Sequence, residues 1–403
     1  MNVLQVNGLY SCGGAETIAR ELYLYFDKKE GINSYFISGF KSKNDIDNVN
    51  IIYESYLLRV LNRLMTNNHK RTPKSMPFTV MYLKRFIRKN NVDVVHFHNT
   101  HGNYLGIKDV KEISKVVPVV WTLHDSWALT GHCASPFECG QWMSCCKNCE
   151  HLDYYFATPK KSWVKQEFKW KNEYYPNNGI TFVTPSAWLM KQAKTRMLPN
   201  EKFFIVNNGI RTDEFLILDK IESRKKLGLP TDKKIIGVIA TNLNTPQKGF
   251  HLLVDALLKI ENIDKYHLVF VGDGEGLSEK LPCTYTSLGT IIDKEKLNQF
   301  YSSLDLLVNP TLMESFGLVN VEAMASGTPV LVFDVGPLKE IVDEKAGWIV
   351  ERIDSDSLSS AISAAFVNQA ILKEKADNAP KIAQEYSIDK MAESYLKIYE
   401  GLI

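Results

Sequence analysis

The order of expected strands and helices constrains the fold of this chain most strongly. Short segments rich in apolar and β-branched residues alternate with longer segments of helical periodicity along the whole sequence. Several of the short segments are apolar throughout, as is typical of parallel strands that are buried on both faces. This alternation predicts an α/β protein built from two doubly wound parallel sheets. The expected strands cover residues 3–6, 34–37, 94–98, 117–123, 181–184, 203–207, 235–240, 267–272, 305–309, 330–333 and 347–350, and the clearest helices cover residues 14–26, 250–261 and 356–367.

The length of the chain also favours two domains. The chain has 403 residues, whereas single hydrophobic cores seldom grow beyond roughly 250–300 residues. A mixed, turn-rich segment between residues 208 and 233 separates the last strand of the first half from the first strand of the second half. We therefore expect the domain boundary there. The final segment, Lys390–Ile403, carries apolar side chains at helical spacing and could pack on either domain.

Charge and hydropathy exclude several classes of protein. The formal net charge is +2, which is not that of a protein that coats nucleic acid. No apolar run approaches the ~20 residues of a membrane span. Met1–Val6 has neither a basic start nor a small-residue cleavage site, and we expect it to be the first strand rather than a signal peptide. The expected compartment is the cytoplasm, where cysteines stay reduced.

The most informative local segment covers residues 314–330 and lies between two expected strands. Glu314 and Glu322 lie eight positions apart in it, and Glu322 stands in an apolar helical pattern where an unpaired carboxylate is costly to bury. Gly317 would let the backbone approach a ligand closely, and the free amides at a helix start bind anions. Carboxylates beside amides suit a ligand with hydroxyls and phosphate, such as a nucleotide sugar. The alternative is a solvent-facing Glu322 and a plain loop at Glu314.

Three further segments follow expected strands, where doubly wound sheets bind ligands. Gly13 and Gly14 follow the first strand and could meet a phosphate, although a tight turn without a ligand is the alternative. Lys248 could reach a phosphate, or could simply be solvated. His124 ends an apolar strand, and its neutral ring could exchange one hydrogen bond with a substrate hydroxyl. A structural histidine paired with Asp125 is the alternative for His124.

Metal chemistry has two candidate segments. Asp354-Ser355-Asp356 resembles the acidic motif of metal-dependent transferases, but it begins a helical pattern, so we interpret it as a helix cap and expect no catalytic metal. Cys133, Cys139, Cys146 and Cys149 are spaced as a loose zinc knuckle, and a structural zinc ion could staple the loop after His124. Reduced thiols without a metal, or an occasional disulfide, are the alternative.

Two basic segments suggest a membrane surface. Between Ser55 and Val92 there is no Asp or Glu, while basic residues run from Arg59 to Lys89 and apolar residues such as Leu57, Leu61 and Leu64 lie among them. A basic amphipathic surface of this kind suits an anionic membrane that carries a lipid-linked acceptor. Residues 160–171 have the same character. A solvated helix face is the alternative.

Taken together, these segments resemble glycosyltransferase family 4, the retaining nucleotide-sugar transferases with a GT-B fold. The resemblance covers most of the chain. Its markers are Gly13-Gly14-Ala15-Glu16, Val206-Asn207-Asn208-Gly209-Ile210, Lys248-Gly249, Val271-Gly272-Asp273-Gly274, and the pair Glu314 and Glu322 with Phe316-Gly317 and Gly327-Thr328-Pro329-Val330. The segment from His124 to Cys133, with the cysteines after it, resembles a colanic-acid-type subgroup that builds bacterial exopolysaccharide and O-antigen units.

The resemblance implies an architecture. Two Rossmann-like domains would face a cleft, with residues 1–207 plus about 388–403 binding the acceptor and residues 208–387 binding the nucleotide-sugar donor. The final helix would cross back onto the first domain.

The resemblance also implies roles for the matching positions. Glu322 would hold the ribose hydroxyls, and Glu314 would bind hydroxyls of the donor sugar. The backbone amide of Gly14 and the charge of Lys248 would meet the diphosphate, while His124 would contact the donor sugar and help to position the reacting centre. The expected catalytic residues are His124 and Glu314, and the expected donor-binding residues are Gly13, Gly14, Lys248, Thr290, Ile291, Glu314, Ser315, Phe316, Gly317, Leu318 and Glu322, with backbone groups near Thr290 and Ile291 at the base.

One departure from the family concerns the diphosphate. The family usually carries Arg six positions before this lysine, and often another directly before it. Here Asn242 and Gln247 occupy those positions. The leaving diphosphate would therefore depend on Lys248, on backbone amides and on a helix dipole.

The function implied is retaining transfer of a hexosyl group from a UDP- or GDP-sugar to a lipid-linked oligosaccharide, in lipopolysaccharide O-antigen or exopolysaccharide biosynthesis. No cofactor is needed for the chemistry, and the protein would associate peripherally with the inner face of the membrane. A sugar-nucleotide epimerase with the same fold is the nearest alternative, and a non-enzymatic, zinc-stapled binding protein is a more distant one. A nucleotide-dependent oxidoreductase would need a strand-linked G-x-G-x-x-G, which is not in place.

Overall fold

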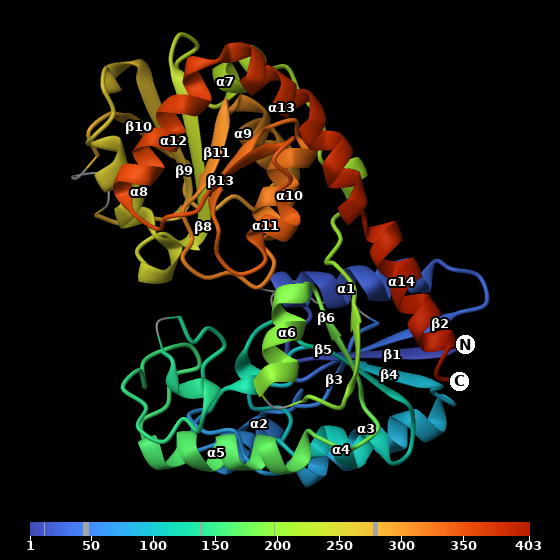
Figure 1. The fold of residues 1–403 in the computed structure, drawn as a ribbon. Helices are drawn as coiled ribbons and strands as arrows, with labels where there is room; N and C mark the ends of the chain where they lie inside the picture. Colours follow the sequence, from blue (N-terminus) through green and yellow to red (C-terminus); the bar gives the residue numbers. More distant parts are fainter. Residues whose placement is uncertain (12, 43–47, 138, 197, 277–280) are drawn as a thin grey trace. The chain divides into compact units, whose positions relative to one another are not determined.

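The chain forms two units, which Figure 1 shows in the computed structural model. The structure describes residues 1–403 except residues 12, 43–47, 138, 197 and 277–280. Unit 1 consists of Met1–Asn207 with Ile388–Ile403, and unit 2 consists of Asn208–Ser387. These are the bounds expected from the sequence for the two domains.

Unit 1 contains a seven-stranded sheet in the order β3-β2-β1-β4-β5-β6-β7, and every neighbouring pair is parallel. The central strands are buried on both faces, which explains why the sequence reads as nearly continuous apolar runs there. The strands are β1 (Asn2–Asn7), β2 (Asn33–Ser38), β3 (Asn50–Ile51), β4 (Val94–Phe97), β5 (Val119–Thr122), β6 (Thr181–Thr184) and β7 (Lys202–Ile205).

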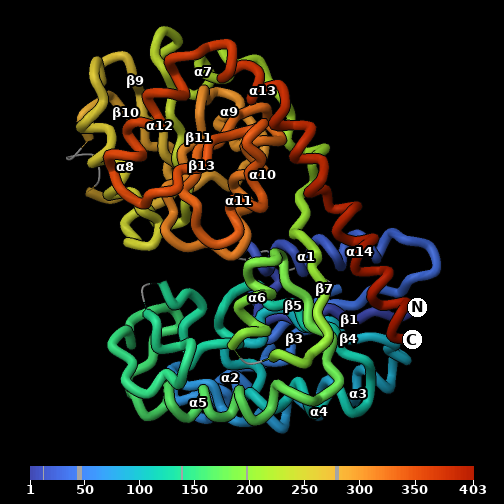
Figure 2. Tube along the Cα trace, in the orientation of Figure 1, coloured from blue at the N-terminus to red at the C-terminus, as the bar shows by residue number. Residues whose placement is uncertain are grey.

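Helices cover both faces of this sheet. Helix α14 packs beside α1 on one face, as Figures 1 and 2 show, and α3, α4 and α5 form a layer on the other face. The expectation that the last helix belongs to the first domain is therefore confirmed. The helices are α1 (Gly14–Asp27), α2 (Tyr56–Met65), α3 (Pro77–Lys89), α4 (Asp109–Ser114), α5 (Lys161–Tyr174), α6 (Ala187–Arg196) and α14 (Ile388–Glu400).

Unit 2 contains a six-stranded parallel sheet in the order β10-β9-β8-β11-β12-β13. Its strands are β8 (Lys234–Asn242), β9 (Tyr266–Asp273), β10 (Thr284–Ser287), β11 (Leu306–Asn309), β12 (Val330–Phe333) and β13 (Gly347–Val350). Its helices are α7 (Lys220–Lys226), α8 (Phe250–Leu257), α9 (Lys294–Ser303), α10 (Leu318–Ala325), α11 (Leu338–Ile341), α12 (Ser355–Val367) and α13 (Gln369–Ala383). Asp354 caps α12 by accepting a hydrogen bond from the Ser357 amide, which confirms the capping interpretation of the acidic pair.

The structure corrects the expected elements in three places. Strands β3 and β10 were not expected, because β3 has two residues and β10 is a mostly exposed edge strand of alternating Thr, Tyr and Ser. The helix expected over Phe250–Glu261 ends at Leu257, and Asn262, with φ of 52°, begins the next turn in a left-handed conformation.

None of the described helices is long and apolar enough to cross a membrane.

Candidate active site

Each sheet reverses its strand order once, between β1 and β4 in unit 1 and between β8 and β11 in unit 2. In doubly wound folds, ligands bind at the carboxyl ends of the strands at such a reversal. In unit 2 the two strands at the reversal lead into the segments that hold Lys248 and Glu314. In unit 1 they lead into the Gly13-Gly14 turn and into His98. Gly13, Gly14, Lys248 and Glu314 therefore follow the carboxyl ends of the strands at these reversals.

Lys248 and Glu314 meet in unit 2. The distance between Lys248 Nζ and Glu314 Oε2 is 3.3 Å. The two segments are joined by their backbones, because the Leu312 amide and the Thr311 hydroxyl both donate to the carbonyl oxygen of Gln247. Both side chains of the pair are partly exposed at the carboxyl end of the sheet. A cation and a carboxylate are thus held beside each other without being sealed from solvent.

Two glycines permit this close approach of backbones. Gly249 has φ of 64°, and a Cβ there would stand 1.9 Å from the carbonyl oxygen of Pro310. Gly317 has φ of 91°, and a Cβ there would stand 2.7 Å from Nδ2 of Asn320. Both positions therefore require glycine, on grounds of conformation and of space.

Helix α10 begins directly after Gly317, so its free amides face the same segment as Glu314. Its first turn contains no acidic residue that would compete for these amides. Nδ2 of Asn320 is buried in this turn, and among the described residues it has no hydrogen-bond partner. The amide of Ser315 is engaged with Glu314 Oε1 at 3.1 Å, and the Phe316 ring is buried. This helix start can accept an anion.

Glu322 is held by a tyrosine. The hydroxyl of Tyr301 donates to Glu322 Oε2 at 2.6 Å. Burial raises the pKa of the Glu322 carboxyl, and the Tyr301 hydrogen bond opposes that effect. A freely solvated Glu322, the alternative that the sequence left open, is therefore wrong. The Tyr301 hydroxyl occupies one carboxylate oxygen and leaves the other available to accept hydrogen bonds.

A cavity of about 540 Å³ lies at the carboxyl ends of β9 and β10. Gly272, Asp273 and Gly274 line it together with Thr290, so the glycine motif after β9 and one of the two expected base-contacting positions share one cavity. Ile291 does not line this cavity and packs against the hydrophobic core of unit 2 instead. Glycines alternate in the lining with polar residues such as Asp273, Glu275 and Ser287.

The two positions that depart from the family are also placed. Oδ1 of Asn242 accepts a hydrogen bond from the Asn244 amide at 2.8 Å and so stabilises the turn after β8. Gln247 contributes its carbonyl oxygen to the contact with residues 311 and 312. Lys248 is the cation that these segments bring to Glu314.

In unit 1, Gly13 and Gly14 form the turn between β1 and α1. Gly13 is the N-terminal cap of α1, and its carbonyl oxygen accepts from the Thr17 amide. Glu16 lies in the first turn and contacts Asn99, whose Nδ2 donates to it at 3.4 Å. An anion at this helix start would therefore meet a carboxylate as well as free amides.

His124 and His98 follow the neighbouring strands β5 and β4. Their rings stack with centroids 5.2 Å apart, and His98 Nδ1 lies 2.9 Å from His124 Nε2. Burial lowers the pKa of His124 to about 4 and that of His98 well below its ordinary value. Both rings are therefore neutral near pH 7.

Asp125 pairs with a different histidine from the one expected. Its Oδ2 lies 3.0 Å from Nε2 of His101, and its Oδ1 accepts from the Trp127 amide. Burial raises the pKa of Asp125, but His101 and the Trp127 amide outweigh burial, so that the pKa is lowered overall. The alternative of a structural His124–Asp125 pair is therefore wrong. Nδ1 of His124 is buried and, among the described residues, has no hydrogen-bond partner.

Sequence reasoning did not single out His98, His101, Tyr301 or Asn320. The signal for His98 was present in the pattern His96-Phe97-His98, which puts two polar rings on one face at the end of an otherwise apolar strand. No such signal exists for Tyr301, because its partner Glu322 lies 21 positions away on another helix.

The four cysteines expected to bind zinc are free thiols in the structure, namely Cys133, Cys139, Cys146 and Cys149. Burial raises the pKa of Cys133 to about 12 and that of Cys146 to about 11. Within the part of the chain that the structure describes, no three His, Cys, Asp or Glu side chains are grouped so that they could hold a metal ion. A zinc ion at Cys139 and its neighbours stays a prediction, which elemental analysis of the purified protein would test.

Comparison with known proteins identifies the family. Residues 12–214 match the family described as Glycosyltransferase Family 4, and residues 219–385 match Glycosyl transferases group 1. WcaC of Escherichia coli, which is named as a glycosyl transferase of colanic acid biosynthesis, is 26% identical over 428 aligned positions that cover 100% of both chains. A glycosyltransferase of Methanocaldococcus jannaschii is 30% identical over 324 positions, which cover 76% of this chain and 75% of that protein.

Solved structures show the same fold. Sucrose-phosphate synthase from Thermosynechococcus elongatus superimposes with a TM-score of 0.73 at 18% identity, covering 100% of this chain and 98% of that one. HepE of Anabaena, solved in complex with UDP, superimposes with a TM-score of 0.70 at 17% identity and covers 100% of both chains. The two parallel-sheet units thus have the expected GT-B fold. The chain belongs to glycosyltransferase family 4, and over its whole length it is similar to a glycosyl transferase of colanic acid biosynthesis.

Proposed function

We propose that this protein is a retaining glycosyltransferase that moves a hexosyl group from a UDP- or GDP-sugar to a lipid-linked saccharide during surface polysaccharide synthesis. Membership of glycosyltransferase family 4 supports transfer, and the name of WcaC supports polysaccharide biosynthesis. Solved structures of HepE in complex with UDP and with UDP-glucose support a nucleotide-sugar donor. The observation that carries the proposal is the Lys248–Glu314 pair beside the start of α10.

Each group of that site has a proposed task toward the donor. Glu314 accepts hydrogen bonds from hydroxyls of the transferred sugar. The Lys248 ammonium and the amides of Gly317 and Leu318 stabilise the negative charge that develops on the departing diphosphate. Because the charged groups are already in place, little reorganisation is needed when the bond to the anomeric carbon breaks.

Glu322 and the cavity after β9 serve the nucleoside in this proposal. The oxygen of Glu322 that Tyr301 leaves available accepts from the ribose hydroxyls. The cavity beside Thr290 receives the base. The family resemblance implies base contacts through backbone groups, which distinguish bases poorly, so the site could accommodate uracil or guanine.

The proposed reaction retains the configuration of the anomeric carbon. Retaining glycosidases place two carboxylates about 5–5.5 Å apart and use one as a nucleophile. We propose no such nucleophile here. The acceptor hydroxyl attacks on the face from which the diphosphate leaves, the glycosidic bond to phosphate breaks, and the departing phosphate oxygen takes the hydroxyl proton. No metal or cofactor takes part in the proposed steps.

The first test is the melting temperature of the protein with UDP, GDP and NAD, each in excess. A ligand that binds only the folded state raises the melting temperature by mass action. A shift with UDP or with GDP, and none with NAD, is expected and would also identify the donor nucleotide. A shift with NAD alone, or no shift of a well-folded protein, would contradict the proposed donor site. Product analysis then distinguishes a transferase from an epimerase, which would convert the nucleotide sugar without any acceptor.

We also propose that unit 1 binds an anionic membrane surface from the cytoplasmic side. Helix α2 carries its apolar stripe outward: Leu57, Leu61, Leu64 and Met65 share one face, and all four are exposed. Its one buried side chain is Asn62, which donates to the Asn103 carbonyl oxygen. A helix that leaves four neighbouring apolar side chains exposed suits the interface of a bilayer.

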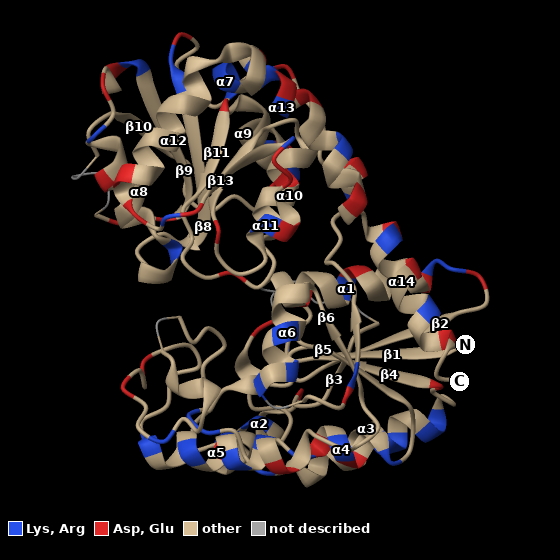
Figure 3. Ribbon diagram, in the orientation of Figure 1, with Lys and Arg blue, Asp and Glu red and all other residues tan. Residues whose placement is uncertain are grey.

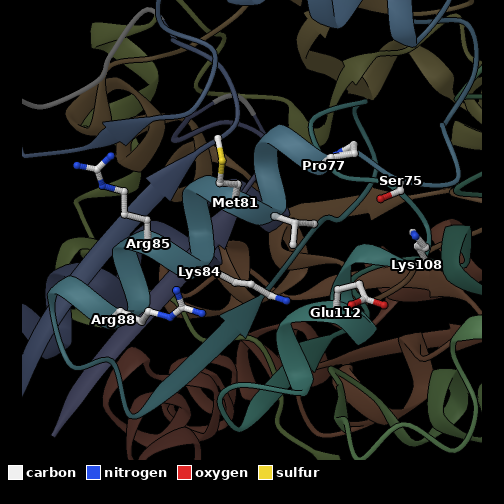
Figure 4. Close-up of a pocket in the computed structure, with 9 residues that line it drawn as sticks. Ser75, Pro77, Met81, Lys84, Arg85, Arg88, Lys108 and Glu112 are labelled. Carbon is white, nitrogen blue, oxygen red and sulfur yellow. The ribbon is translucent and has the colours of Figure 1, made fainter.

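A groove between α3 and α4 adds the charges that such a surface needs. It has a volume of about 630 Å³, and Figure 4 shows the side chains that line it. Its four cations, Lys84, Arg85, Arg88 and Lys108, form no ion pair with described residues, and its one carboxylate, Glu112, is paired with Lys115 at 2.8 Å. Pro77, Val80 and Met81 supply an apolar wall. The groove therefore suits the phosphate and the first methylenes of an anionic lipid.

The second basic segment contributes less than the sequence suggested. Figure 3 shows basic positions along α5, and Lys161, Lys165 and Lys169 are exposed there. Lys171, however, is buried, and its ammonium donates to the carbonyl oxygens of Trp127 and Thr130. The helical period turns residue 171 to the inner face with Val164, so the expectation of a surface lysine there is wrong.

A further inference from the structure

An unbroken chain of hydrogen bonds connects helix α14 with His124 inside unit 1. The hydroxyl of Tyr399 lies 2.6 Å from Nδ1 of His96 and 3.4 Å from Nε2 of Gln5. Oε1 of Gln5 lies 2.8 Å from Nε2 of His98. Nδ1 of His98 in turn lies 2.9 Å from Nε2 of His124. The chain ends at Nδ1 of His124, which has no partner among the described residues.

This network lies in the interior of the sheet, where polar side chains are costly. Gln5, His96 and Tyr399 are fully buried, and His98 is 1% exposed. Gln5 stands in the middle of β1, where apolar side chains such as Val6 occupy neighbouring positions. Burying polar groups costs free energy unless every member is hydrogen-bonded. Here each inner member is bonded on both sides, and only the terminal atom is left open.

The bonds determine which nitrogen of each ring carries the proton. A neutral imidazole has one donor nitrogen and one acceptor nitrogen, and burial lowers the pKa of both rings so that they are neutral. A carboxamide oxygen can only accept, so His98 Nε2 is protonated and its Nδ1 is the acceptor. His124 must then donate through Nε2, which leaves its Nδ1 with a lone pair.

We propose that Gln5 and His98 are positioning residues that hold His124 as the Nε2-protonated tautomer, so that its Nδ1 accepts a hydrogen bond from a hydroxyl of the transferred sugar. The identity of that partner rests on the proposed function, whereas the tautomer does not. A histidine in the other tautomer would present an N–H at the same place and would prefer an acceptor such as a phosphate oxygen.

Tyr399 supports this direction of the chain. Nε2 of Gln5 donates to the Tyr399 hydroxyl, so that Oε1 of Gln5 faces His98 and the hydroxyl proton is available to Nδ1 of His96. Nε2 of His96 then donates to the Thr122 hydroxyl at 2.7 Å. Helix α14 follows unit 2 in the sequence, yet it thus helps to orient the ring of His124 through three successive hydrogen bonds.

The tautomer can be measured directly. In full-length protein labelled with ¹⁵N in its histidine rings, the His124 signals are identified by their loss in His124→Asn. We expect Nε2 of His124 to be protonated and Nδ1 to be bare at pH 7.5. A protonated Nδ1 with a bare Nε2 would overturn the proposal, because it would mean that every bond in the chain runs in the opposite direction.

A matched pair of variants tests the role. In His98→Asn the new carboxamide lies where Nδ1 of the His98 ring was, so it keeps an acceptor for Nε2 of His124. In His98→Gln the carboxamide lies where Nε2 was, so it keeps only the hydrogen bond to Gln5. We expect His98→Gln to weaken binding of the nucleotide sugar roughly 10-fold, the effect of losing about one hydrogen bond. His98→Asn should stay closer to the native affinity, and both variants should bind the free nucleotide equally well.

The outcomes separate the two proposals. Equal losses in the two variants, or equal losses for the sugar-bearing and sugar-free nucleotide, would mean that His98 is merely structural. If either variant fails to fold, Tyr399→Phe, which lacks one hydroxyl, replaces it, and a mixture of His124 tautomers is then expected in the ¹⁵N spectrum. If His124 has the expected tautomer but the protein binds neither UDP nor GDP, the proposed function is rejected. The roles of Gln5 and His98 in setting the tautomer are then retained.

Discussion

Lys248 and Glu314 are 66 positions apart in sequence, yet their charged atoms lie 3.3 Å from each other where the sheet of unit 2 reverses its strand order. Each neutralises the other in the free protein. A diphosphate bound by Lys248 and a sugar hydroxyl bound by Glu314 would replace this contact with two other charge-assisted hydrogen bonds. The pair is therefore expected to keep both side chains in position before the donor arrives.

Replacing either Glu314 or Glu322 should abolish or severely reduce transfer while the protein stays folded. Glu314→Gln and Glu322→Gln each remove an acceptor for donor hydroxyls, and we expect a loss of about 100-fold or more in kcat/KM. The shift of melting temperature with UDP or GDP should shrink most in Glu322→Gln. Glu351→Gln, at an exposed position, is the control and should behave like the native protein. Near-normal transfer by both variants would refute the site.

Gly317→Ala should destabilise unit 2 and impair nucleotide binding together. The new Cβ would stand 2.7 Å from Asn320 Nδ2 on a backbone with φ of 91°. Such a conformation costs about 1–3 kcal/mol for a non-glycine residue. Gly140→Ala is the matched control, because a Cβ at Gly140 meets no atom within 4 Å. Thermal unfolding with and without nucleotide measures both effects, and equal behaviour of the two variants would contradict the prediction.

Stability should fall as the pH drops from 6.5 toward 4. An unfolded chain protonates His124 near its ordinary pKa of 6.5, whereas burial keeps the folded ring neutral until about pH 4. Protons therefore bind preferentially to the unfolded chain within this window, and the stability that is fully present above pH 6.5 is lost progressively below it. The difference in melting temperature between native protein and His124→Asn isolates this effect from the carboxylates. A difference that does not change between pH 7 and pH 5 would contradict the prediction.

The outward stripe of α2 should be dispensable for folding and needed for membrane binding. Leu57→Gln combined with Leu64→Gln changes two exposed side chains, so the melting temperature should move little. Flotation with phosphatidylglycerol vesicles should show reduced binding. The native protein should release these vesicles at high salt, since exposed charges are screened.

Leu258→Gln is the control for that experiment. Leu258 is 63% exposed, close to the 66% of Leu57 and the 74% of Leu64, but it lies in unit 2. It should leave flotation unchanged. Absence of native binding to both neutral and anionic vesicles would remove the membrane proposal.

Most of the fold and part of the candidate site could be predicted from the sequence, and the reason is physical. Buried parallel strands appear in the sequence as local apolar runs, and the residues just after them, such as Lys248 in unit 2 and His124 in unit 1, must lie at the carboxyl end of the sheet of their own unit. Partners across the fold leave no such local signal. Which residue contacts Glu322 and which contacts Asp125, namely Tyr301 and His101, depends on packing between distant segments. Lys171 shows the same limit, because its charge alone suggested exposure and its position on the helix decided burial.

The place of α14 has a consequence for how the protein is made. Residues 1–207 leave the ribosome long before Tyr395 and Tyr399, whose hydroxyls complete the bonding of Thr122 and His96 in the interior of unit 1. Until then, polar groups in its sheet lack their final partners, and a nascent first unit carries that deficit. Unit 2 has all its strands by residue 350 and can finish first. The order of folding is thus expected to run opposite to the order of synthesis.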